Sequence, residues 1–480
     1  MRLGIPRIKI PLKPSEVSKA TIEKYLDTVW SQFESNARHI SNDYDFYCLD
    51  QPIRHKIRAH NDTDINNQII IPDIKTAIDW KLGYVFGNPI KYAQSKSIDT
   101  DDISYLHKYF RSVSQRSIDK DVGKWAYTTG VGYYFVEPRS DKFDVLSEAP
   151  YRIYQIDSDK CTKVYSAFYG EDALFDMLYT TYEDKGDGVT KQTIKVLDIY
   201  TADALYTYEK RDFQSGWAFV SEKSRGVSKP LPLVEKRLNT DGIGIVTMAR
   251  DLQNSLNTLM SNGVDNVEEI VNEIFVYKNV DLGDDPAASH RKMRRNGAIS
   301  ISAPAGSGDT SVTTISPKSG LAEIKELFAI VNEKFHTVIG VPMEISNTNS
   351  GGTTKSGSEV ANGYDNAYNH ALDDINSFIV ADTELLYKIM WICKNTVNNP
   401  INNLDFSDIE IKYWLNLTDN IQIKSQAFGT FIQYMPPEKA LAYTRLSNDP
   451  EADGRLIRDS EIYQAFLAKA GATQNNNPQG

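Results

Sequence analysis

The sequence predicts an α+β fold divided into several domains, and three observations support this. The 480 residues exceed the roughly 250–300 at which a single hydrophobic core stops growing. Residues 130–208 contain short aromatic and β-branched runs separated by turns, which is typical of strands. Runs with apolar residues every three or four positions lie on both sides of this stretch and predict helices.

The N-terminal region is predicted to place helices before and within an α+β domain that ends near residue 238. A helix is expected over residues 14–39, with Ser15 as its N-cap. A second helix contains the apolar residues of 74–82, and a third covers 101–128. The strand-rich stretch follows the third helix.

Two predicted helices surround an insert in the middle of the chain. The first runs from about residue 242 to 274 and carries an apolar stripe at spacings of three and four. Residues 277–319 are rich in Gly, Ser and Pro and include the basic run HRKMRRNG. The second helix covers 321–338. Polar side chains that lie largely off the stripe of the first helix include Asn257, Ser261, Asp265 and Glu268.

A polar stretch, residues 340–357, interrupts two helical patterns. Ser, Thr, Asn and Gly dominate it, and between residues 345 and 358 it has one Lys, Lys355, and no acid. A flexible linker fits these residues better than a phosphate-binding P-loop, because Thr354 rather than Gly precedes the lysine and the stretch follows a helix.

The longest helical pattern follows, over about residues 358–395, with Ser356 as a plausible cap. A helix of this length would be on the order of 60 Å long and would need neighbours along it. One strand is expected over 404–418, helices over 421–470, and a disordered tail over 471–480. Breaks in the last helical region are expected at Pro436–Pro437 and Asp449–Pro450.

Composition and motifs argue against an enzyme. The net charge of −11 argues against a broad grip on nucleic acid, although a protein that lets nucleic acid pass without sticking is not excluded. Cys48, Cys161 and Cys393 are too scattered for a disulfide framework or a metal site, which fits a reducing cytoplasmic setting. No secretory signal, membrane span or complete catalytic motif is found, so we expect no catalytic residue, cofactor or metal.

Three segments, read in chain order, resemble one known family. They are NNQIIIPDIKTAIDWKLGYVFGNPIKY, WAYTTGVGYYFVEP and GVPMEISNTNSGGTTKSGSEV. Their order is similar to that of the portal proteins of tailed bacteriophages, in the siphovirus-type group of Gram-positive hosts, over about residues 21–463. The sequence departs from the family in KPLPLVEKRLNTDGIGIV, which has Asn239 alone and a Gly-Ile-Gly turn at 242–244.

The resemblance implies a portal-type fold and a structural function. The implied regions are a wing over 1–238, stem helices over 239–276 and 320–339, a clip over 277–319, a tunnel loop over 340–357, a bridging helix with a return strand of the wing over 358–420, a helical crown over 421–470 and the tail. Such proteins form a ring, usually a dodecamer, at one capsid vertex of the virion after assembly in the host cytoplasm. Double-stranded DNA passes through the ring.

The implied partners are the terminase motor, a head-completion or adaptor protein, and the major capsid and scaffold proteins, with no membrane. Two alternatives remain open. A DNA-packaging or nucleic-acid-processing enzyme is disfavoured by the missing P-loop. A neck or tail adaptor ring is disfavoured by the size of the chain and its long helix.

Three sets of site residues follow from the resemblance. The DNA-facing set of the tunnel loop is Ser346, Asn347, Thr348, Asn349, Ser350, Thr353, Thr354, Lys355 and Ser356, whose polar groups offer weak, exchangeable hydrogen bonds. The lumen-facing set of the stem is Asn257, Ser261, Asp265 and Glu268. The partner-binding set of the clip is Arg291, Lys292, Arg294 and Arg295, for which a solvated charged turn is the alternative.

Overall fold

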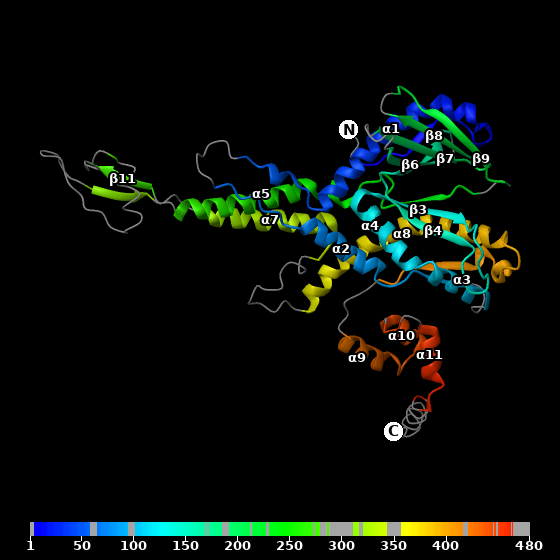
Figure 1. The fold of residues 1–480 in the computed structure, drawn as a ribbon. Helices are drawn as coiled ribbons and strands as arrows, with labels where there is room; N and C mark the ends of the chain where they lie inside the picture. Colours follow the sequence, from blue (N-terminus) through cyan, green and yellow to red (C-terminus); the bar gives the residue numbers. More distant parts are fainter. Residues whose placement is uncertain are drawn as a thin grey trace, which may run out of the picture.

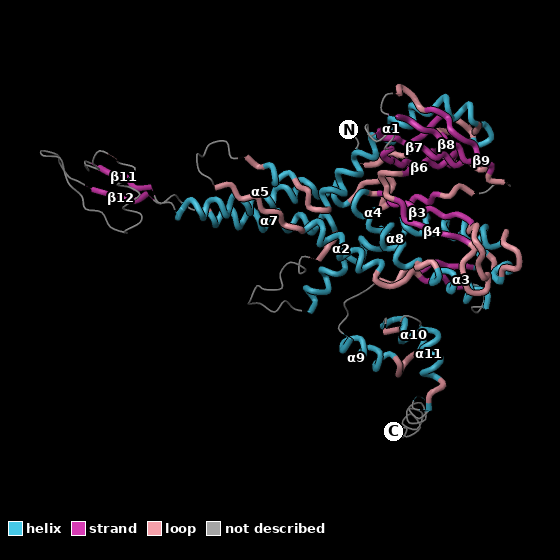
Figure 2. Tube along the Cα trace, in the orientation of Figure 1, coloured by secondary structure: helices cyan, strands magenta, loops and turns pink. Residues whose placement is uncertain are grey.

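The computed structural model describes residues 4–57, 65–94, 101–168, 170, 172–184, 192–211, 214–226, 230–271, 274–278, 285, 288, 311–315, 320–342, 357–415, 421–444, 446–447, 450–461 and 463. Sheets and helices form a body from which two helices, α5 (Ile245–Val271) and α7 (Leu321–Ile339), project side by side (Figure 1). Strands and helices are mixed along the chain (Figure 2), which confirms the predicted α+β class.

Helix α1 (Lys19–Tyr47) begins later than predicted and runs further. Its N-cap is Ser18, whose Oγ accepts the backbone N–H of Thr21 at 3.4 Å. The prediction of Ser15 as the cap is wrong, because Pro14–Glu16 forms a separate 3-10 turn with proline at its first position. Ser18 therefore caps the start of α1.

The predicted helix over 101–128 is two helices. These are α3 (Asp101–Ser112) and α4 (Gln115–Thr129). Ser114 between them has a φ of 55°, in the left-handed region, so one continuous α-helix cannot pass through it. Helix α2 (Asp73–Phe86) forms where the spacing of its apolar residues predicts it.

A six-stranded sheet has the order β1-β5-β6-β7-β8-β9. Strand β1 is parallel to β5, and the other neighbours are antiparallel. Helix α1 contributes Ile22, Val29 and Phe33 to the core that Phe175 and Leu197 form on the sheet. The strands are β1 (Ile8–Ile10), β5 (Cys161–Ser166), β6 (Ala173–Asp184), β7 (Gln192–Tyr200), β8 (Ala204–Arg211) and β9 (Ala218–Ser224).

Smaller antiparallel sheets complete the described strands. They are β10 (Leu233–Arg237), β3 (Val131–Pro138) and β4 (Tyr151–Ile156), in the order β10-β3-β4, and the pairs β13 (Ile409–Lys412) with β2 (Lys91–Gln94) and β11 (Ile274–Lys278) with β12 (Ser311–Ile315). The strand predicted over 404–418 is therefore too long. Asp405 accepts the backbone N–H of Ser407 and caps a 3-10 turn, so the strand starts only at Ile409.

Helix α8 (Gly357–Lys394) is the long helix that the sequence predicts, and it packs into the body. Its residue Phe378 belongs to a core shared with α2 and α4, whereas Leu386 belongs to a second core with β3 and β4. Lys236 of β10 and Asp382 of α8 form an ion pair at 2.7 Å, with neither side chain exposed. Apolar packing and this ion pair together fix the helix.

The base of α5 packs tightly against the end of α4. Gly130 has a φ of 94°, and a Cβ there would lie 2.2 Å from the carbonyl oxygen of Gly242. A Cβ on Gly244 would lie 2.3 Å from the carbonyl oxygen of Thr128. Only residues without a Cβ let these two backbones approach so closely, which fixes the point where α5 leaves the body.

The last described part of the chain is a group of three short helices. They are α9 (Ile421–Phe431), α10 (Pro437–Thr444) and α11 (Pro450–Arg458). The breaks predicted at Pro436–Pro437 and Asp449–Pro450 lie between them. Helices α10 and α11 pack closely, since a Cβ on Gly454 would lie 2.7 Å from the Cα of Glu438.

Candidate functional site

Two of the three predicted sets of site residues lie outside the described residues. The DNA-facing set, Ser346 to Ser356, falls within 343–356, and the basic run Arg291 to Arg295 falls within 289–300. Both sets therefore stay predictions. The third set lies on α5, whose side chains are described as far as Glu268.

The polar side chains of α5 bind an extended segment of the same chain, residues 65–71, which we call the strap. The strap lies beside α5 in Figure 1. Backbone N–H groups of Ile74, Ile71, Ile69 and Asn67 donate to side-chain oxygens of Gln253, Asn257, Ser261 and Asp265 at 3.0, 2.9, 2.9 and 2.7 Å, respectively. We call these four bonds the polar ladder.

The spacing of the polar ladder follows from the geometry of a helix beside an extended chain. Its acceptors are four residues apart on α5, a rise of about 6.0 Å. Its donors within the strap are two residues apart, a rise of about 6.6 Å. The two rises nearly match, so successive donors meet successive acceptors.

The polar ladder corrects the prediction that Asn257, Ser261 and Asp265 face a channel. All three side chains are fully buried within the chain, and their oxygens accept backbone hydrogens of the strap and its flank. Asn257 also donates to Oε1 of Gln51 at 2.5 Å. Glu268, the fourth predicted residue, is exposed and stays a prediction.

Asp265 is the most strongly bonded residue of the polar ladder. Lys56 Nζ donates to its Oδ2 at 2.8 Å, and Asn67 donates to its Oδ1 from both the backbone and the side chain. Burial alone would raise the pKa of Asp265, but the hydrogen bonds from Lys56 and Asn67 outweigh it and lower the pKa. The carboxylate is therefore charged, and it ties both the strap and Lys56 to α5.

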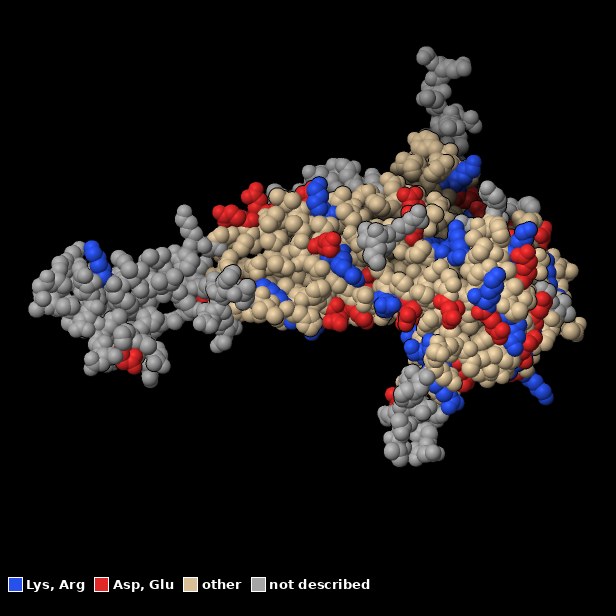
Figure 3. All heavy atoms as spheres, turned by 90° about the horizontal axis from the view of Figure 1, so that it is seen from above, with Lys and Arg blue, Asp and Glu red and all other residues tan. Residues whose placement is uncertain are grey.

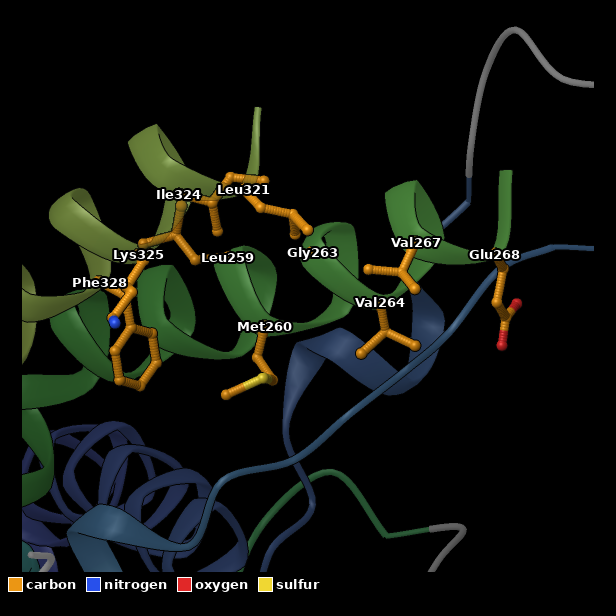
Figure 4. Close-up of a pocket in the computed structure, with 10 residues that line it drawn as sticks. All are labelled: Leu259, Met260, Gly263, Val264, Val267, Glu268, Leu321, Ile324, Lys325 and Phe328. Atoms are coloured by element: carbon orange, nitrogen blue, oxygen red, sulfur yellow. The ribbon is translucent and has the colours of Figure 1, made fainter. Parts of the chain in front are cut away.

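The apolar side of α5 faces α7 and forms a groove near the far end of the pair. The groove has a volume of about 640 Å³ and is lined by Leu259, Met260, Gly263, Val264, Val267, Glu268, Leu321, Ile324, Lys325 and Phe328. Figure 4 shows that nearly all of these side chains are apolar. Met260, Val267 and Leu321 remain 37%, 45% and 40% exposed in the single chain.

Helix α7 carries a second apolar row on another side. Leu327, Ile330 and Val338 are 48%, 50% and 43% exposed. Ile330 follows Ile324 of the groove by six residues, which places it about 120° around the helix. We call Leu327, Ile330 and Val338 the ridge. The α5–α7 pair therefore offers an apolar groove and an apolar ridge that face different directions.

Figure 3 shows acidic and basic side chains intermixed over much of the body surface. Within the described part of the chain, no helix has the length and apolar character needed to cross a membrane.

Comparison with known families identifies relatives of this chain. The family described as "Phage portal protein, SPP1 Gp6-like" matches residues 26–468. The chain belongs to this family of phage portal proteins. It is 22% identical over 354 residues to the portal protein of Bacillus phage SPP1, covering 68% of this chain and 64% of that protein. Membership in the portal family places the chain in the phage virion, at the capsid vertex.

The strap is the feature of this portal-family chain that the sequence analysis missed. Gln51, Lys56 and Asn67 all bond to α5, although no motif marks them. One signal was present: Gln253, Asn257, Ser261 and Asp265 repeat every four residues. Such a line of polar residues on a helix predicts a row of hydrogen-bonding groups, but not its occupant. The Gly-Ile-Gly departure at 242–244 is explained by the tight base of α5.

Proposed function

We propose that this chain is the structural subunit of a portal ring, through which double-stranded DNA is packaged and ejected. The family match over residues 26–468 carries the proposal. The subunit would act without a catalytic step, as the docking site for the packaging motor and for head-completion proteins. The chain covers 64% of the SPP1 portal protein, so the activity of the whole protein belongs to the proposal.

The α5–α7 pair supports a ring. Neighbours in a closed ring meet through two different surfaces, one on each side of every subunit. The groove and the ridge of the pair are two such surfaces. Burial of apolar side chains yields roughly 25 cal/mol per Å², so covering both would favour association.

The region assignment follows the same proposal. Helices α5 and α7 would be the stem, the residues between them the clip, and 343–356 the tunnel loop. Helix α8 would bridge the stem to the wing, and α9 to α11 would form the crown. Lys355, repeated around the ring, would give a belt of positive charge that touches phosphates lightly.

Native mass spectrometry with negative-stain imaging tests the proposal. A closed ring with a central hole, near twelve times the chain mass of 54.1 kDa, is expected. A protein that remains monomeric at high concentration and is absent from purified virions would overturn it. The region assignment has its own test: Arg294→Glu with Arg295→Glu should keep the ring but weaken capture of the motor or adaptor, and unchanged capture would remove the clip assignment.

A further inference from the structure

Helix α2 lies between α5 and α8 and is bonded to both. At its start, the backbone N–H of Ile74 donates to Gln253 of α5 at 3.0 Å. N–H groups in the first turn of a helix lack partners within the helix, and α2 has no cap from its own N-cap residue, Pro72. A side chain of α5 therefore caps α2.

The other end of α2 is fastened to α8. Lys81 Nζ lies 3.1 Å from Oδ2 of Asp374, and the two side chains are 7% and 14% exposed. The rings of Phe86 and Phe378 are 5.8 Å apart between centroids. Ion pairs with little solvent around them are geometrically demanding, so these contacts hold α2 and α8 in one relative position.

The strap and α2 are one continuous piece of chain. Residues 67–74 meet α5 at four points, and residues 81–86 meet α8. The helical part spans 14 residues, or about 20 Å. The chain thus bridges α5 and α8, which are also linked through α4, whose Tyr127 ring packs on Phe378 of α8, and through β10, whose Lys236 pairs with Asp382 of α8.

We propose that residues 67–86 form a strut that transmits displacement of α5 to α8. A shift or tilt of α5 moves the acceptors of the polar ladder, which pull the strap, the start of α2 and then Asp374. This inference concerns one chain and holds whether or not rings form. A further route runs through α7, which ends at Ile339, because a Cβ on the next residue, Gly340, would lie 2.4 Å from the ring of His370 in α8.

Hydrogen–deuterium exchange on the full-length chain tests the strut. The ladder variant is Ser261→Ala with Asp265→Ala. The matched control is Asp251→Ala with Ser255→Ala, because these residues are the same pair of types, four apart, on the exposed side of α5. The ladder variant should exchange about tenfold faster in 65–71, with a smaller increase in α2 and in residues 370–378. The control should match the unmodified chain.

A second exchange experiment separates the strut from the other contacts that join α5 to α8. In a Lys81→Met background, the ladder variant should still loosen 65–71 and α2, but the added response of 370–378 should disappear. An equal response of α8 with and without Lys81 would assign the coupling to contacts outside the strut and overturn it. No response of α8 in the first experiment, or faster exchange throughout β6 to β8, would also overturn it.

Discussion

Helix α8 of the body and helix α7 of the projecting pair differ in what their side chains contact. Helix α8 buries a charged residue, Asp382, deep in the body, where Lys236 neutralises it. Helix α7 leaves Leu327 and Ile330 about half exposed. The comparison teaches that α8 is fixed by contacts within one chain, whereas the apolar side chains of α7 at these two positions remain about half exposed in the single chain.

The largest effect is expected from breaking the Lys236–Asp382 ion pair inside the body. Asp382→Ala removes the carboxylate that pairs with the buried Lys236, which should lower the free energy of unfolding by about 3–5 kcal/mol. Urea denaturation followed by circular dichroism measures this. The double variant Lys236→Met with Asp382→Leu should recover most of the loss, since both charges are gone. A single-variant loss below about 1 kcal/mol would contradict this account.

A substitution in the projecting α5–α7 pair should affect assembly rather than the stability of the single chain. Ile330→Asp places a charge in the ridge, so rings should be lost while the free energy of unfolding of the single chain changes by less than about 0.5 kcal/mol. Size-exclusion chromatography with light scattering reports the assembly state. The control Val220→Asp alters a residue on β9 that is similarly exposed, at 49%, and should leave rings intact. Rings that survive Ile330→Asp would remove the ridge from the interface.

A smaller loss of stability is expected when one acceptor of the polar ladder is removed. Ser261→Ala leaves the N–H of Ile69 without its acceptor, which should lower the free energy of unfolding by about 1–3 kcal/mol. Ser255→Ala on the exposed side of the same helix should change it by less than about 0.5 kcal/mol. Chemical denaturation of both variants makes the comparison. Equal losses would mean that the strap contributes nothing at this rung.

A separate effect concerns the pH dependence of stability. Burial raises the pKa of Asp119 to about 7, although Lys236 opposes the shift. The folded protein therefore binds this proton more tightly than the unfolded chain, so its contribution to stability is present at low pH and is lost as pH rises from about 4 to 7. Compared with Asp119→Asn, the unmodified protein should lose stability between pH 5 and pH 7. A difference that stays constant over this range would show that Asp119 does not titrate there.

The sequence predicted those elements whose apolar spacing is regular. Helices α2, α5, α7 and α8 appear because each keeps one apolar face over several turns. The break at Ser114 was missed, since neither Gly nor Pro marks it. Strand β11 was also missed, because a short apolar run fits either the end of a helix or a strand.

The candidate site was harder to predict for a different reason. Spacing shows which side chains of α5 lie off the apolar stripe, but it does not show what covers them. The covering residue Asn67 is 198 positions away from Asp265 along the chain. Only the folded structure brings them together, and it turns an expected channel lining into an internal contact.

The polar ladder also carries a limit on its own length. Each step advances about 6.0 Å along the helix and about 6.6 Å along the extended chain, so donors and acceptors drift apart by about 0.6 Å per rung. Donors and acceptors are therefore within hydrogen-bonding distance for a few steps only. A longer strap could follow α5 only by kinking or by leaving one backbone N–H without an acceptor on α5. The mismatch in rise therefore limits the length of this contact.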